Sequence, residues 1–211
     1  MSLVIVRGIL EREHNRESFA KLIGKYYPTT DERFKDIMRA YGIAKEAFQE
    51  KTRESGERYF EHLRAVALIL IEYMRISDHD MIVTALLHDI VEDFRKKWFY
   101  DRLTKEFNET VSGLTWWLTK PPVEEFGSKI DRDRHYHHQL LFRAPRKALV
   151  IKLPDRLHNL LTMWDVTPEK RARKITETED FYLPLAVRES ILIHEIEAAL
   201  DELKNGHTTH G

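Results

Sequence analysis

Apolar residues recur at intervals of three and four along most of the chain, which is the spacing of one face of an α-helix. From about residue 59, a core-facing helix is predicted by Leu63, Val66, Ala67, Leu70 and Met74. After a Ser77-Asp78 cap, the next helix is predicted by Met81, Ile82, Ala85, Leu86 and Ile90. Alternation typical of a strand is confined to residues 3–6, where strand and helix are equally favoured. The pattern therefore predicts an all-α protein.

Caps and breakers predict the remaining boundaries. A cap at Thr29 or Thr30 starts a helix near residue 31, Gly42 stops it, and a short helix follows over 43–51. Pro154 lies inside the apolar stretch 146–164, so we expect a kink or a helix start near it. Further helices are predicted over 101–107, 111–119, 132–142, 169–174 and 184–203.

No internal repeat or long linker divides the 211 residues, so we expect one domain. We place this domain at residues 41–204. A short N-terminal helical extension is expected over residues 1–40, and a flexible tail over 205–211.

The amino-acid composition excludes several kinds of functional site. The chain has no Cys, which excludes disulfides, thiolate nucleophiles and Cys-bound metals, so any metal must be held by the 11 His and the carboxylates. The 34 Lys and Arg nearly balance the 35 Asp and Glu, so no surface for nucleic acid or an anionic membrane is indicated. The apolar stretch 63–74 is too short to span a bilayer, and the first residues are not typical of a signal peptide. We therefore expect a cytoplasmic protein.

The segment 85–93 carries the strongest chemical signal. His88, Asp89, Glu92 and Asp93 follow an apolar run, and grouped buried carboxylates need a cation to neutralise them. The alternative is that the helix reaches the surface near residue 88 and these are ordinary exposed charges. A second His-Asp pair at 79–80 lies in a polar first turn and is interpreted as a solvated cap.

Two other segments supply further polar residues that could belong to the same site. In the stretch 151–159, Asp155 and Asn159 are four residues apart and can share a helix face. The stretch 53–62 leads from a turn into a helix and supplies another His, at position 62.

Together these segments resemble the HD-domain hydrolases of the RelA/SpoT type, the alarmone hydrolases of the stringent response. The resemblance covers residues 53–186. It rests on R-x-S-G-E-x-Y-x-x-H (53–62), A-L-L-H-D-x-V-E-D (85–93), L-T-K (118–120), I-K-L-x-D-R-L-H-N (151–159), E-T-E (177–179) and P-L-A (184–186). The chain has no room for the family's synthetase and regulatory domains, so we expect an HD-domain helical bundle acting as a stand-alone small alarmone hydrolase.

The resemblance implies a metal site. Its ligands would be His62, His88, Asp89 and Asp155, which leave positions for water and substrate. Manganese is the usual ion in this family, while the ligand chemistry would also admit iron or zinc.

The resemblance also implies catalytic and substrate-binding residues. Glu92 and Asp93 match the acidic pair that positions or activates the attacking water. Contacts to the nucleotide would come from Arg53, Lys152, Asn159 and Thr162. The expected reaction is removal of the 3′-pyrophosphate of guanosine tetra- or pentaphosphate, which yields GDP or GTP.

Glu54 and Leu161 depart from the family pattern, because both positions often carry a basic residue there. Another substrate of the same chemistry therefore stays open, such as the 2′-phosphate of NADPH or a nucleotide. A non-catalytic nucleotide-binding signalling domain is the third interpretation. Self-association is also left open.

The remaining polar segments are interpreted as surface or packing residues rather than as parts of a site. The run 134–138 (R-H-Y-H-H) is interpreted as an exposed helix face rather than a second metal site, and the run 171–174 as a solvated face. His158 is expected to pack or to form a hydrogen bond nearby rather than to bind metal.

Overall fold

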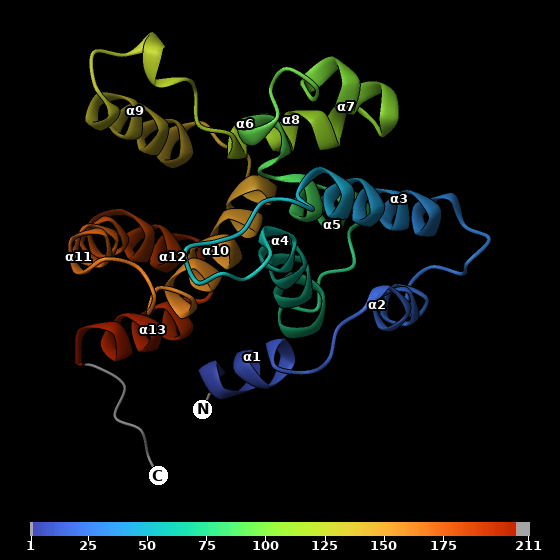
Figure 1. The fold of residues 1–211 in the computed structure, drawn as a ribbon, viewed down its shortest axis with the longest axis horizontal. Helices are drawn as coiled ribbons and strands as arrows, with labels where there is room; N and C mark the ends of the chain where they lie inside the picture. Colours follow the sequence, from blue (N-terminus) through green and yellow to red (C-terminus); the bar gives the residue numbers. More distant parts are fainter. Residues whose placement is uncertain (1, 206–211) are drawn as a thin grey trace.

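The computed structural model describes residues 2–205 and is helical almost throughout (Figure 1). Within these residues the sole β-pairing is an isolated bridge between Thr52 and Arg58. The α-helices are α1 (Ser2–Leu10), α2 (Arg16–Ile23), α3 (Glu32–Ala47), α4 (Tyr59–Leu68), α5 (His79–Leu87), α6 (Ile90–Asp93), α7 (Tyr100–Glu106), α8 (Glu109–Leu118), α9 (Lys129–Phe142), α10 (Arg146–Leu161), α11 (Pro168–Glu177), α12 (Leu183–Glu189) and α13 (Ile193–Asn205). The shorter helical segments are η1 (Ile69–Tyr73), η2 (Val123–Glu125) and η3 (Thr178–Tyr182). The predicted all-α class is confirmed.

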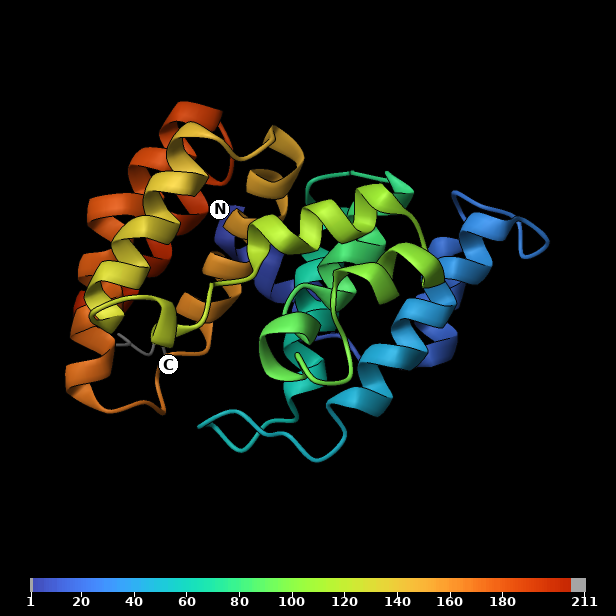
Figure 2. The ribbon, with the colours of Figure 1, turned by 90° about the horizontal axis from the view of Figure 1, so that it is seen from above.

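Helix α10 is the centre of the fold. It packs against α4, α5 and α8 on one side and against α12 and α13 on the other, as Figures 1 and 2 show. Twelve of its residues are buried, among them the charged Lys152, Asp155 and Arg156. A helix that is surrounded on all sides must bury any polar residue it carries, so these side chains need partners inside the protein.

Capping explains several helix starts. The Asp78 carboxylate accepts the Met81 N–H at 3.0 Å and begins α5, as predicted. Thr167 likewise caps α11 from the position before Pro168, where the ring of proline costs no hydrogen bond. Helix α11 lines the central cavity through Lys170 and Lys174, and α5 leads to His88.

Residues 3–6, where strand and helix were equally favoured, are helical. Two predicted boundaries are wrong. Helix α3 continues through Gly42, because Tyr41, Ala44 and the following Phe48 pack into the core and outweigh the cost of about 1 kcal/mol for a helical glycine. The predicted helix 184–203 is divided into α12 and α13 by left-handed backbone at Ser190 and Leu192.

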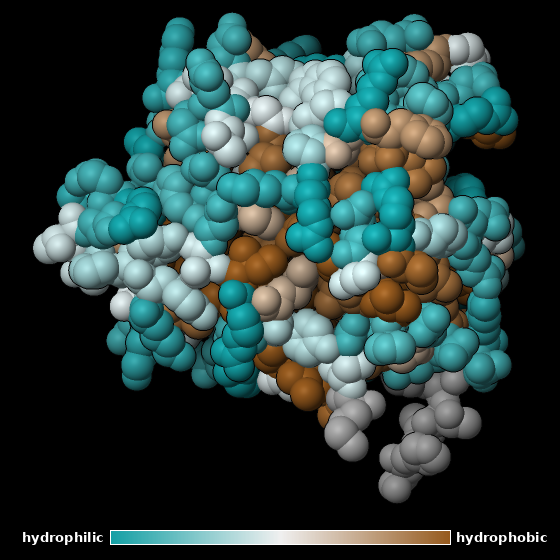
Figure 3. Space-filling view, turned by 180° about the vertical axis from the view of Figure 1, so that it is seen from behind, coloured by the Kyte–Doolittle hydropathy of each residue, from teal (hydrophilic) through white to brown (hydrophobic). Residues whose placement is uncertain are grey.

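Pro154 lies inside α10, which runs from Arg146 to Leu161 without a break. The predicted tail over 205–211 falls outside the described residues apart from Asn205, which ends α13. Within residues 2–205, no helix is both long and apolar enough to cross a bilayer. Hydrophilic side chains cover most of the face seen from behind, with apolar side chains showing between them near its centre (Figure 3).

Candidate metal centre and its cavity

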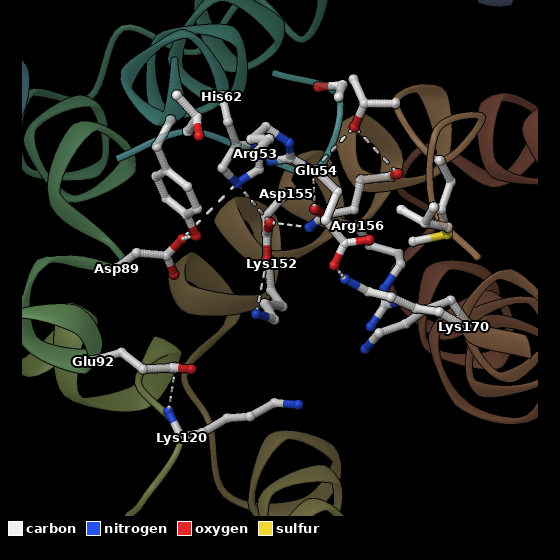
Figure 4. A pocket seen from close by; sticks show the side chains of 18 of the residues that line it. Arg53, Glu54, His62, Asp89, Glu92, Lys120, Lys152, Asp155, Arg156 and Lys170 are labelled. Carbon is white, nitrogen blue, oxygen red and sulfur yellow. Dashed lines mark hydrogen bonds and ion pairs between the residues drawn. The ribbon is translucent and has the colours of Figure 1, made fainter. Parts of the chain in front are cut away.

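His62, His88, Asp89 and Asp155 come together at the centre of the bundle (His62, Asp89 and Asp155 are labelled in Figure 4). His62 projects from α4 and Asp155 from α10. His88 ends α5 and Asp89 begins α6, so the chain changes direction between them. Adjacent residues of a continuous helix point in different directions. This break lets two neighbouring residues face one point.

The distances among these groups are short. Nε2 of His62 lies 3.2 Å from Oδ1 of Asp155 and 4.0 Å from Oδ2 of Asp89. Nε2 of His88 lies 3.3 Å from Oδ2 of Asp89 and 3.8 Å from Oδ1 of Asp155. Among the described residues, one set of His and acidic side chains has three potential ligand atoms within 4.8 Å of one another, and it consists of His62, His88 and Asp155.

The hydrogen bonds of His88 leave one nitrogen for an ion. Nδ1 donates to the Ala85 carbonyl at 2.8 Å, while Nε2 is buried and has no hydrogen-bond partner. Burial alone would lower the pKa of His88, but the carboxylates of Asp89 and Asp155 outweigh it and raise the pKa to about 9. Two imidazole nitrogens facing carboxylate oxygens form a donor set that suits a divalent transition metal, so the residues present fit such an ion.

Other side chains hold the potential ligands in place. Nδ1 of His62 lies 2.9 Å from Nδ1 of His158, which confirms that His158 forms a hydrogen bond nearby and lies behind the centre. The Tyr59 hydroxyl donates to Asp89 at 2.6 Å. Such outer contacts fix the orientation and the tautomer of metal ligands.

Asp155 is the most enclosed of the acids. Lys152 forms an ion pair with its Oδ2 at 2.8 Å, and the Asn159 amide donates to its Oδ1 at 2.6 Å. Burial raises its pKa, but Lys152 and the two histidines, His62 above all, outweigh burial and hold the pKa well below its usual range. Asp155 therefore stays ionised inside the bundle.

The two acids of α6 point to different places. The Glu92 side chain lines the cavity, and one of its oxygens accepts the Lys120 backbone N–H at 3.1 Å. Crowding by protein atoms and then the negative charge of Asp89 raise the pKa of Glu92, although the side chain reaches solvent. Asp93 forms an ion pair with Lys51 at 2.5 Å and lies outside the lining of the cavity.

A cavity of about 430 Å³ opens beside the metal centre. One corner holds three of the predicted substrate-binding residues: Nη2 of Arg53 donates to Asn159 at 2.9 Å and to Thr162 at 3.0 Å. The loop that carries Arg53 turns at Gly56, whose φ of 82° is a conformation that favours glycine. The fourth predicted residue, Lys152, lines the same cavity.

Several cavity residues were not predicted as site residues. They are Tyr59, Lys120, Arg156, Lys170 and Lys174. Tyr59, Lys120 and Arg156 lie within the motifs quoted for the resemblance, so a signal for them was present. Lys174 was interpreted as part of a solvated face, which is wrong, because its ammonium group reaches the buried ion pair of Arg156 and Glu177.

Glu54 and Leu161, the two residues that depart from the family pattern, lie in different parts of the structure. Glu54 lines the cavity and forms an ion pair with Lys170 of α11. Leu161 lies away from the cavity, beside a separate hollow of about 220 Å³ next to α1. The cavity is lined by six Lys and Arg side chains and four carboxylates, so it retains an excess of positive charge.

Comparisons with known proteins identify the family of the chain. The family model described as HD domain matches residues 40–192. The bifunctional (p)ppGpp synthase/hydrolase SpoT of Escherichia coli K12 is 34% identical over 189 residues, which are 89% of this chain and 26% of that protein. A guanosine-3′,5′-bis(diphosphate) 3′-pyrophosphohydrolase of Aquifex aeolicus is 37% identical over 174 residues, covering 82% of this chain and 23% of the relative. The chain thus spans about a quarter of the length of these relatives.

A solved structure shares the fold. It is described by the words "A metazoan ortholog of SpoT hydrolyzes ppGpp and plays a role in starvation responses". The TM-score is 0.65 with 24% identity, over 81% of this chain and 94% of that one. The resemblance inferred from the motifs is confirmed.

Proposed function

This chain belongs to the HD-domain family, and from that premise we propose that it is a metal-dependent phosphohydrolase that removes pyrophosphate from the 3′ position of guanosine tetra- or pentaphosphate. The observation that carries the proposal is the meeting of His62, His88, Asp89 and Asp155 at the wall of a cation-rich cavity. The names of the relatives support the choice of substrate.

The ion would be held by these four side chains, and we propose manganese. The donor set of two imidazoles and two carboxylates supports a divalent transition metal, and iron or zinc would satisfy the same donors. When bound, such an ion lowers the pKa of a coordinated water and polarises a phosphoryl oxygen.

The nucleoside would occupy the corner formed by Arg53, Asn159 and Thr162. This corner offers a guanidinium group and a hydroxyl beside the apolar Met163 and Val166, a combination that suits a flat, polar base. The 3′-pyrophosphate would then extend past the metal centre toward Lys152 and Lys120. Their positive charges would neutralise the charge that develops on the phosphate oxygens.

Glu92 is the proposed general base. Its raised pKa and its place on the cavity wall support this role. The water oxygen forms a bond to the phosphorus that carries the ribose 3′ oxygen, the bond between that phosphorus and the 3′ oxygen breaks, and Glu92 takes a proton from the water. That proton then passes to the 3′ oxygen, which leaves a free hydroxyl and pyrophosphate. Asp93, beside Lys51, is proposed to position Glu92 and the turn that carries it.

We also keep the division of the chain as a proposal. Residues 41–204 would form the catalytic unit and residues 1–40 an extension. The packing of α1 against η1 and α13 supports an extension that closes the bundle on the side of α4 away from α5.

The test is a panel of nucleotides assayed with purified protein and manganese. Pyrophosphate release from guanosine tetra- and pentaphosphate alone is the expected result. Glu92→Gln should reduce turnover by about 10²- to 10⁴-fold, the range for a general base, while Asp93→Asn should cost less. Orthophosphate release from NADPH would favour the 2′-phosphatase instead, and nucleotide binding without turnover would favour the signalling domain.

A further inference from the structure

A second hollow lies between α9 and the end of α11 with η3. Its volume is about 690 Å³, and its lining includes six Lys and Arg side chains and four carboxylates. The size falls in the range of small-molecule sites. The motifs that define the metal centre contribute to it only Glu92, Lys120 and Glu177. We call this hollow the α9–α11 groove.

The α9–α11 groove adjoins the metal cavity. Glu92, Lys120 and Lys174 line both hollows. In Figure 4, Glu92 and Lys120 lie on the side of the cavity opposite His62, and the Lys120 side chain runs along that side. The Lys120 ammonium group pairs with Asp133 of α9 at 3.1 Å, which joins the two hollows at this side chain.

The groove has positive charge to offer an anion. Asp133 already has Arg132 at 2.7 Å and Lys120 as partners, and Glu177 has Arg156 at 3.2 Å and Lys174. By contrast, Lys129 and Arg173 form no ion pair with any described residue, and neither do the lining carboxylates of Glu92 and Asp180. The positive charge offered to an anion is therefore the excess of six Lys and Arg side chains over four carboxylates in the lining.

The cations at the junction are crowded. Burial and then the positive charge of Arg156, with a smaller contribution from Lys120, lower the pKa of Lys174 to about 8. Crowded cations gain from a multivalent anion because one ligand then neutralises several of them.

The placement of the substrate in the proposed reaction indicates that the anion is the leaving pyrophosphate. With the nucleoside at the corner of Arg53 and Thr162 and the scissile phosphorus at the metal centre, the outer phosphate points away from the nucleoside. Lys120 lies on the side of the cavity opposite His62 (Figure 4), and Lys120 and Lys174 line both hollows. A leaving group that moves in this direction enters the groove.

We propose that the α9–α11 groove is a pyrophosphate subsite, in which Lys120 and Lys174 receive the leaving group and Lys129 and Arg173 lead it to solvent. This inference rests on the proposed function for the identity of the anion. It adds a binding surface outside the metal centre, and it predicts that inorganic pyrophosphate binds without metal or nucleotide.

The first test is calorimetric titration of the metal-free protein with inorganic pyrophosphate, orthophosphate and GMP. A Lys129→Ala/Arg173→Ala variant should weaken pyrophosphate binding about tenfold or more, since it removes two cations that would form charge-assisted hydrogen bonds with the anion. Lys21→Ala, an exposed cation of α2, is the matched control and should leave this affinity unchanged. All three substituted side chains are exposed, so circular dichroism should show folded proteins.

Three outcomes would overturn the subsite. Pyrophosphate affinity equal in the wild type and the double variant would do so. So would an equal loss in Lys21→Ala, which would indicate only the general charge of the protein. The third is a groove that binds an oligoglutamate peptide and not pyrophosphate, because this would indicate a protein partner.

The same experiment separates this inference from the proposed function. Binding is measured without metal and without turnover, so groove-dependent pyrophosphate binding in a protein that fails to hydrolyse the alarmone would reject the proposed function alone. If the protein does hydrolyse the alarmone, the double variant should also raise the inhibition constant of pyrophosphate by the same factor as its dissociation constant. An unchanged inhibition constant would overturn the subsite and leave the hydrolase intact.

Discussion

The metal centre and the α9–α11 groove lie side by side but are built in opposite ways. His62, His88 and Asp155 are each at most 6% exposed and come from helices that are packed on several sides. Helix α11 has no buried residue, and α9 has only Tyr136 and Leu140. The centre is therefore positioned by the core, whereas the groove presents long charged side chains from two outer helices.

This difference reflects two tasks. A metal needs lone pairs fixed to within fractions of an ångström, and close packing with outer hydrogen bonds provides this precision. A phosphate chain that must arrive and leave needs charge that can adjust. The contrast predicts that changes at the centre abolish binding or folding, while changes in the groove shift affinity alone.

The largest effect is expected from Asp89→Asn. An amide removes the charge that faces His88 at 3.3 Å, so metal binding should be lost and turnover should fall by about 10³-fold or more. Metal content by elemental analysis and turnover by pyrophosphate release measure this. Pyrophosphate binding in the groove should persist in the variant. Unchanged turnover would show that the centre is not the catalytic site.

The second prediction compares how much substitutions in the core and in the groove lower the stability of the protein. Leu157 of α10 is fully buried, so Leu157→Ala should lower the free energy of unfolding by about 2–5 kcal/mol. Arg134→Ala on α9 should change it by at most about 0.5 kcal/mol, because that side chain is 77% exposed. Urea denaturation compares the two. Equal losses would mean that α9 is as essential to the core as α10.

An intermediate effect, on metal affinity, is expected from the contact between His62 and His158 behind the metal centre. A metal bound at Nε2 of His62 requires the proton on Nδ1, which then donates to His158. His158→Ala should weaken metal affinity about 10- to 100-fold, and His158→Asn should recover part of it through its amide oxygen. Metal titration with a competing chelator measures both variants. Equal loss in the two variants would indicate a packing role only.

The smallest effect is a pH dependence at the junction. Because the pKa of Lys174 is lowered to about 8, its ammonium loses its proton as pH rises through that value. Pyrophosphate affinity should then fall by roughly tenfold between pH 7 and pH 9, the effect of losing one charge-assisted hydrogen bond. Burial is the largest cause of this lowered pKa; of the charged groups that face Lys174, Arg156 and Lys120 lower the pKa further and Glu177 opposes them. Lys174→Arg keeps its charge and should flatten the profile, whereas an unchanged profile would exclude Lys174 as the titrating group.

Much of the candidate site was predictable because its residues interrupt apolar stretches. His88 and Asp155 stand out in this way from the linear pattern alone, and Asp89 follows His88 directly. The different directions of Glu92 and Asp93 were not predictable, because they depend on the short helix α6 and on Lys51 from another segment. Lys174 was missed because a charged run on an outer helix has the same pattern whether it faces solvent or a cavity.

The amino-acid pattern alone determined the helical class, the principal caps and the kinds of side chain available for binding a metal, because periodicity, capping and chemistry are local properties of the chain. Packing decided the rest. The approach of His62 to Asp155, the approach of Arg53 to Asn159 and the sharing of lining residues by the cavity and the α9–α11 groove all require segments distant in sequence to meet. These contacts depend on the packing of other helices around α10. No single segment of the sequence determines that packing.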